Sequence, residues 1–267
     1  MATTRLSIGA FAALVVASIA AFFVTQHLKV TTPLVQGGGA GPFPVPSAIN
    51  PVHPVQCGNH NTGSTTISFY LQHRSDDVIV SVIDAHDDVV RTVADGRHMR
   101  KGVRNPDGVF HWNGRLTDGR IAPDGTYHFR VTLIHEGSTI DLSDVPVTVK
   151  TVPPHPIITR VTPSAIPSPS GSRQVTIHYN GNENRGGTIL LYRLEASGRA
   201  RLIKRFLTPW KGQAAVWDGT VSGQRPAPAG TYLLALEVSD AACNTGRYPA
   251  QIPPAGGSPA TSVVTVR

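Results

Sequence analysis

The chain has 267 residues, of which 40% are hydrophobic and 15% charged, so it can bury one large core or two ordinary ones and is not intrinsically disordered. Its 26 glycines and 22 prolines are typical of an all-β protein, in which every strand needs a turn. The formal net charge of +7 suits anionic lipids or wall polymers, whereas an aromatic content of only 6% and the lack of a basic stripe argue against a nucleic-acid partner.

Residues 6–24 read LSIGAFAALVVASIAAFFV and contain no charged side chain. A helix of this length nearly spans a hydrocarbon core of about 30 Å. Arg5 precedes the run, so the N-terminus is expected to stay in the cytoplasm and the remainder to be translocated. Residues 1–30 are therefore predicted to be a signal-anchor or transmembrane segment in the cell membrane. The alternative is a signal peptide cleaved near Ser18-Ile19-Ala20, which would release a secreted protein.

Residues 31–56 contain six prolines, four glycines and no charged side chain. Such a composition is typical of a linker that combines polyproline and flexible stretches. It predicts a spacer between the membrane and the folded body.

An internal repeat follows, with a period of 105 residues. Trp112-Asn113-Gly114 recurs as Trp217-Asp218-Gly219, and Pro123-Asp124-Gly125-Thr126-Tyr127 recurs as Pro228-Ala229-Gly230-Thr231-Tyr232. The spacing from Trp to Tyr is fifteen in both copies, which indicates one duplicated fold unit per half. The residues that define the repeat are Trp112, Gly114, Gly125, Tyr127, Trp217, Gly219, Gly230 and Tyr232.

The repeat has the chemistry of β-turns and strands. Asn-Gly and Asp-Gly favour tight hairpin turns, and the segments that start at Tyr127 and Tyr232 alternate as strands do. Short strands and no helix beyond residue 30 predict two tandem immunoglobulin-like β-sandwiches, at 57–152 and 153–267, with a semi-rigid hinge at 152–156. Further strands are expected at 66–72, 78–84, 88–93, 109–112, 145–150, 157–161, 173–180, 187–193, 200–206, 214–217 and 260–267.

The Trp-(Asp/Asn)-Gly and Pro-x-Gly-Thr-Tyr motifs resemble the Ig-like domain of flagellar hook-capping, FlgD-like, proteins. The resemblance covers roughly residues 57–267 and implies a fold rather than a function. The stretch 239–246 is similar to the acidic Asp-x-x-Gly-Asn loop of these domains, with Cys243 at the usual glycine. Two such domains and a membrane segment depart from a hook-capping protein, so the hook-assembly role is not carried over.

The two cysteines, Cys57 and Cys243, are expected outside the cytoplasm, where disulfides persist. A bridge between them would staple the two domains side by side. In an extended tandem Cys57 would lie at the far end, and the bridge could not form, because bridged Cα atoms must come within about 7 Å. Free thiols and an intermolecular bridge remain alternatives.

No metal, cofactor or enzyme activity is predicted. The eleven histidines never pair as His-x-His or His-x-x-x-His, and the cysteines form no Cys-x-x-Cys pair. Asp84, Asp87 and Asp88 lack the alternating ligands of a calcium loop. No nucleophile elbow, phosphate loop or dinucleotide fingerprint occurs.

The segment 97–104 carries four cations, Arg97, Arg100, Lys101 and Arg104, in an expected loop of the first domain. It is interpreted either as a solvated hairpin or as a loop that recognises an anionic lipid, wall polymer or acidic protein. Trp210, beside Lys211, is a second candidate contact.

The sequence thus predicts a non-enzymatic structural or protein-interaction module of the cell envelope. The alternatives are a module that binds carbohydrate or an anionic wall polymer, and an accessory subunit of a separate envelope enzyme. Exposure of Trp112, Trp210 and Trp217 separates the first two hypotheses, because burial of all three would leave no aromatic platform for a sugar.

Overall fold

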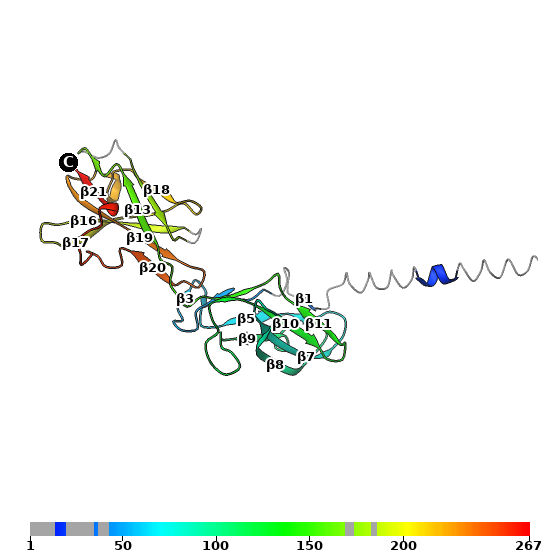
Figure 1. Ribbon diagram of the computed structural model, residues 1–267. Coiled ribbons are helices and arrows are strands. Elements are labelled where there is room, and N and C mark those ends of the chain that lie inside the picture. The colour runs from blue at the N-terminus through cyan, green and yellow to red at the C-terminus, as the bar shows by residue number, and fades with distance from the viewer. Residues whose placement is uncertain (1–13, 20–34, 37–42, 169–173, 183–185) are drawn as a thin grey trace, which may run out of the picture.

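A computed structural model describes residues 14–19, 35–36, 43–168, 174–182 and 186–267. It shows two β bodies, one after the other along the chain (Figure 1). Residues 14–19 are helical, and the rest of the expected membrane segment lies outside the described residues. Within the described ranges, no helix is both long and apolar enough to cross a bilayer.

The first sandwich is built from strands β1 to β12. Its larger sheet has the order β2-β12-β10-β7-β8, with β11 paired to β10, and β5 pairs with β9 opposite it. The strands are β1 (Val35–Gln36), β2 (Ala48–Ile49), β3 (Gln56–Cys57), β4 (His60–Asn61), β5 (Thr65–Ser68), β6 (Tyr70–Leu71), β7 (Asp76–Ile83), β8 (Val89–Met99), β9 (Val109–Trp112), β10 (Gly125–Leu133), β11 (Ser138–Asp141) and β12 (Val147–Val149).

The second sandwich is built from β13 to β21. A three-stranded sheet, β13-β15-β18, faces a sheet of order β14-β21-β19-β16-β17 with β20 paired to β19. Its elements are β13 (Ile157–Thr162), β14 (Ala165–Ile166), β15 (Val175–Asn180), β16 (Gly187–Leu194), β17 (Ala200–Leu207), β18 (Ala214–Trp217), the 3-10 turn η2 (Ser222–Gln224), β19 (Gly230–Ser239), β20 (Thr245–Tyr248), η3 (Ala260–Ser262) and β21 (Val263–Val266).

The larger sheets of the two sandwiches have the same strand order, which extends the duplication beyond the repeat seen in the sequence. A two-residue strand opens each of these sheets and runs parallel to the last strand: β2 beside β12, and β14 beside β21. Both short strands lie in the tetrapeptide Pro-Ser-Ala-Ile, at 46–49 and 163–166. Sequence periodicity does not indicate these strands, because two residues are too few to alternate.

Each repeated Trp–Tyr pair lies in the core of its own sandwich. Trp112 and Trp217 are 1% and 0% exposed, and their ring centroids lie 5.0 Å and 5.6 Å from those of Tyr127 and Tyr232. Each indole Nε1 donates to a carbonyl three residues onward. Each tyrosine hydroxyl donates to the carbonyl of the proline four residues earlier. The motif therefore ties the loop between two sheets to a buried aromatic pair, and the two cores share no residue.

The expected tight hairpins after the two tryptophans do not form. Gly114 has a φ of 68° and Gly219 of 74°, the left-handed conformation that glycine favours. However, β9 pairs with β5 whereas β10 pairs with β7, so the chain crosses between sheets after Trp112. The same crossing separates β18 from β19.

Two further expectations are corrected. The segment 31–56 is not only a spacer, because Ile49 is fully buried and β2 pairs with β12. The strand expected at 88–93 runs instead from Val89 to Met99. Its exposed face is polar almost throughout, so apolar alternation did not reveal it, yet Met99 pairs with Asp76 at its end and is fully buried.

The environment of Asp76 predicts that the first sandwich loses stability at low pH. Its buried carboxylate accepts hydrogen bonds from the backbone N and Nδ1 of His135 and from Glu136 N, at 2.9–3.0 Å. Burial raises the pKa of Asp76, but these hydrogen bonds outweigh it and hold the pKa below its ordinary value of 3.8. A carboxyl group with a lowered folded pKa stabilises above its unfolded pKa, and that contribution is lost as the pH falls through the folded value.

Asp76→Asn should therefore lower the free energy of unfolding at pH 7 by about 1–3 kcal/mol. Between about pH 5 and pH 2 the variant should lose less stability than the wild type, because it has no carboxyl group to protonate. Urea titrations of both proteins across this range measure the effect. Parallel pH profiles would show that Asp76 does not contribute.

Candidate functional site

The loop 240–244, between β19 and β20, is the part of the second sandwich that reaches the first. Asp240 N donates to Asn244 O at 3.0 Å, and the Asp240 carboxylate accepts from Ala242 N and Asn244 N at 2.9 Å and 3.0 Å. Cys243 has a φ of 59°. It therefore occupies a left-handed backbone position that favours glycine, as the resemblance to the Asp-x-x-Gly-Asn loop implies.

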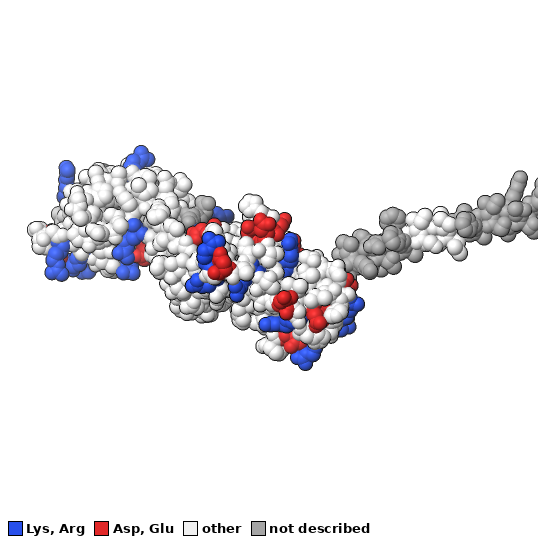
Figure 2. Space-filling model, turned by 60° about the horizontal axis from the view of Figure 1, so that its bottom comes forward, with Lys and Arg blue, Asp and Glu red and all other residues white. Residues whose placement is uncertain are grey.

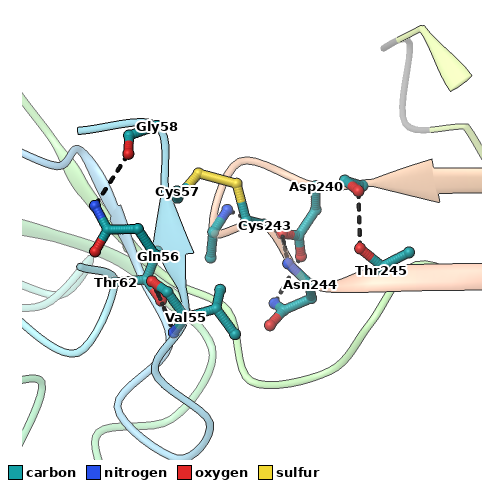
Figure 3. The surroundings of a disulfide bond; sticks show 11 residues. Val55, Gln56, Cys57, Gly58, Thr62, Asp240, Cys243, Asn244 and Thr245 are labelled. Carbon is teal, nitrogen blue, oxygen red and sulfur yellow. Dashed lines mark hydrogen bonds between the residues drawn. A yellow bond between two sulfur atoms is a disulfide. The ribbon is translucent and has the colours of Figure 1, made fainter. Parts of the chain in front are cut away.

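Cys243 forms a disulfide with Cys57, and the Cα atoms lie 5.9 Å apart. Figure 3 shows the bridge joining β3 of the first sandwich to this loop of the second. A side-by-side arrangement is not needed, because Cys57 does not lie at the far end of an extended tandem. It lies on the β3–β4 hairpin, an insertion between β2 and β5 that is located where the two sandwiches meet (Figure 1).

Asn244 adds hydrogen bonds between the two sandwiches. Its Nδ2 donates to Lys150 O at 3.0 Å and to Asp240 Oδ2 at 2.9 Å, and its Oδ1 accepts from Asn50 Nδ2 at 2.5 Å. Asn50 is 1% exposed and Asn244 7%. Loss of either side chain would leave a buried polar group without its partner, which costs about 1–3 kcal/mol.

The connection between the sandwiches packs against the second one. Pro154 and Pro156 are buried, and a Cβ on Gly246 would lie 1.8 Å from Pro154 O. The expected adjustable hinge is thus held close against β20. The disulfide, the Asn244 hydrogen bonds and this packing together restrict the relative orientation of the sandwiches.

Two of the four predicted basic residues, Arg97 and Arg100, interact with other residues of the first sandwich. Arg97 lies in β8, where its Nη1 donates to Val109 O at 2.8 Å and its guanidinium lies 4.7 Å from the Phe110 ring centroid. Arg100 forms a bidentate pair with Asp107, at 2.8 Å and 3.1 Å. Hydrogen bonds from Arg100 lower the pKa of Asp107 below its ordinary value.

Lys101 and Arg104 follow on the exposed turn after β8. The backbone of Lys101 is held by a hydrogen bond from its N to Ser75 Oγ at 2.9 Å. Neither side chain forms an ion pair within the described part of the chain. Lys101 and Arg104 are therefore the two remaining candidates for recognising an anion.

The three tryptophans differ in their solvent exposure. Trp112 and Trp217 are core residues, so they offer no platform to a ligand. Trp210 is 65% exposed on the loop after β17, and Leu207, three residues earlier in the sequence, is 80% exposed. A single exposed indole remains as a candidate contact.

The predicted acidic triplet has a structural role. Asp84 Oδ1 accepts from His86 N at 2.8 Å and Asp88 N at 3.1 Å, which closes the turn between β7 and β8. These hydrogen bonds lower the pKa of Asp84. Within the residues that the structure describes, no group of three or more His, Cys, Asp or Glu side chains could hold a metal ion.

The fold and the junction define an all-β protein with two Ig-like sandwiches joined by a covalent bridge. Residues 58–137 match the FlgD Ig-like domain family, so this part of the chain is an FlgD Ig-like domain. Over 79 residues the chain is 33% identical to the basal-body rod modification proteins FlgD of Salmonella typhimurium and, equally, of Escherichia coli strain K12. These matches cover 30% of this chain and 32% of each relative, so they span about a third of the relatives' length.

Comparison of the coordinates finds weaker likenesses. A marsupial T cell receptor aligns with 76% of this chain and 68% of its own, at 9% identity and a TM-score of 0.37. The immunoglobulin domains 1–5 of Sidekick-1 align with 85% of this chain and 38% of theirs, at 12% identity and a TM-score of 0.28. Neither superposition bears on function.

Proposed function

We propose that this chain is a non-enzymatic scaffold or protein-interaction module that a membrane segment at residues 6–24 displays outside the cytoplasm. The observation that carries the proposal is the junction, because a disulfide together with buried hydrogen bonds between Asn50, Lys150 and Asn244 holds two sandwiches in one orientation. A fixed pair of β surfaces suits the positioning of a partner. The match of the first sandwich to the FlgD Ig-like domain supports the same role.

The location outside the cytoplasm is supported by the uncharged run at 6–24 and by the disulfide, since such bonds persist in oxidising compartments. Cells that express the full chain can be quenched with acid and treated with a thiol-alkylating reagent of high mass. Cys57 and Cys243 should escape alkylation in the full chain. A chain that lacks residues 1–30 should be alkylated at both cysteines, because it would stay in the cytoplasm. Full alkylation of the intact chain would exclude the proposed location.

The exposed cations of the first sandwich give a test of partner binding. Lys101→Glu/Arg104→Glu should reduce the yield of cross-linked partner from intact membranes by about tenfold at low salt, and less at high salt, because exposed charges act over a screened distance. The measurement is cross-linking followed by mass spectrometry of the adducts. Arg160→Glu/Arg267→Glu makes the same change in charge on the second sandwich and is the matched control. An unchanged set of adducts would remove the basic loop from the interaction.

The exposure of Trp210 favours a second candidate, a module that binds carbohydrate or a wall polymer. Purified full-length protein would be sedimented with isolated cell wall, with and without Trp210→Ala. A loss of sedimentation in the variant would support this candidate. Equal sedimentation of both proteins, or none of either, would leave the protein-interaction module as the proposal.

A further inference from the structure

A groove of about 430 Å³ opens on the side of the second sandwich, beside β17. Its cationic lining consists of Arg193 at the end of β16, Arg201 on β17 and Arg225 on the loop before β19. Its apolar lining includes Leu202 and Val221. Among the residues that the structure describes, no carboxylate lines the groove. Its volume lies within the range of ligand-binding sites.

The three groove arginines differ from the structural arginines of this protein. Arg193 donates to the carbonyl of Ala229 at 3.1 Å and Arg225 to that of Ser222 at 3.5 Å. Arg201 lies 3.6 Å from an exposed Glu195 oxygen. Within the described segments, none of these arginines forms a bidentate carboxylate pair. Such pairs are made elsewhere, by Arg100 with Asp107 and Arg130 with Asp141. Arg247 donates twice to one oxygen of Glu237.

The corresponding groove of the first sandwich provides an internal comparison. It has about 380 Å³ and is lined by Val89, Leu116 and Asp118, among others. There, Arg120 is paired with Asp118 at 2.5 Å. At the 105-residue spacing of the repeat, Arg120 corresponds to Arg225 in the second sandwich, while glycine replaces Asp118.

One further acid near the first groove, Asp124, has no counterpart in the second. Tyr127 has Asp84 and Asp124 as its charged neighbours, whereas the equivalent Tyr232 has Arg193. Alanine stands at the position that matches Asp124, and its carbonyl is the one that Arg193 contacts. The second groove thus keeps the arginine that corresponds to Arg120 but has no carboxylate at the positions that match Asp118 and Asp124.

The cationic lining of the second groove agrees with the charge of the whole sandwich. Residues 31–150 contain ten Lys or Arg and twelve Asp or Glu, whereas residues 151–267 contain twelve and five. Figure 2 shows acidic side chains gathered on the part of the molecule nearest the N-terminal trace and few at the opposite end. A negatively charged ligand would therefore be drawn to the second sandwich before it reaches the groove.

We propose that this groove binds an acidic, extended peptide segment of a partner protein, with carboxylates on Arg193, Arg201 and Arg225 and an apolar side chain against Leu202 and Val221. Guanidinium groups match carboxylates in a bidentate geometry. The mixed lining favours a peptide over a uniformly hydrophilic phosphate polymer. β17 is the last strand of its sheet, so an extended segment can lie along it. This inference rests on the proposed interaction role and names the class of partner.

The test uses the detergent-solubilised full chain and a fluorescein-labelled octapeptide in which glutamate alternates with leucine. Fluorescence anisotropy should show binding that weakens as salt rises. Arg193→Gln/Arg225→Gln should raise the Kd by about tenfold or more. The matched control is Arg115→Gln/Arg120→Gln in the first sandwich, which should change the Kd less than about twofold.

Three further measurements test whether carboxylates, and not another property of the peptide, are recognised. A peptide with glutamine in place of glutamate should not bind, and polyglycerol phosphate should compete poorly. Arg201→Glu/Arg225→Glu should transfer the preference to a peptide with lysine in place of glutamate, which separates a charge effect from misfolding. Equal affinity of wild type and Arg193→Gln/Arg225→Gln, or stronger competition by polyglycerol phosphate, would overturn the proposal. Failure here with partner cross-links still formed elsewhere would leave the interaction role intact.

Discussion

Trp217→Ala should destabilise the second sandwich by about 3–5 kcal/mol, the largest effect that we expect from a single substitution in this chain. The side chain is 0% exposed, packs against Tyr232 and donates from its Nε1 to Thr220 O at 2.8 Å. Its removal would leave a cavity and remove the hydrogen bond to Thr220 O. Because the two cores share no residue, the first sandwich should retain its own stability.

Hydrogen exchange measured by mass spectrometry separates the two responses. Exchange in β15 and β18 should accelerate in Trp217→Ala while exchange in β5 and β9 stays at the wild-type rate, and Trp112→Ala should give the opposite pattern. Trp210→Ala is the matched control, since that indole is 65% exposed, and should cost less than about 1 kcal/mol. Equal acceleration in both sandwiches would indicate a single cooperative unit and contradict the two-core description.

Cys57→Ser should release the junction while leaving both cores folded. The bridge joins positions 186 residues apart, and its loss should destabilise the junction by about 2 kcal/mol. Exchange of the amides in 50–62 and 240–244 should then accelerate roughly 30-fold. Reduction of the wild-type protein should reproduce the effect. Unchanged exchange would show that the Asn244 hydrogen bonds hold the junction without the bridge.

A second variant separates the bridge from the backbone at its end. Cys57→Ser leaves a free cysteine at a φ of 59°, where a side chain is strained. Cys57→Ser/Cys243→Gly also lacks the bridge but has the residue suited to that conformation, so it should be about 1 kcal/mol more stable than the single variant. Urea denaturation of the two proteins measures the difference. A less stable double variant would contradict the assignment of Cys243 to a glycine position.

The all-β class and the duplication could be read from local signals. Trp112 and Trp217 end short strands, and the alternation after Tyr127 and Tyr232 places every second residue in a core. These signals are local because a turn and the two faces of a strand are set by neighbours within a few residues. The strands β9 and β18 were accordingly predicted with their observed bounds.

Contacts between distant segments were decided only by the tertiary structure. Whether Cys57 meets Cys243 depends on which end of the first sandwich carries the β3–β4 insertion, and neither residue's neighbours indicate that. Arg193, Arg201 and Arg225 line one groove but come from three separate elements. The sequence around each arginine does not indicate that the three lie together. Strand pairing β2 with β12 likewise joins segments about a hundred residues apart. Such contacts are fixed by how the sheets pack, because local periodicity records which face of a strand is buried but not what covers it.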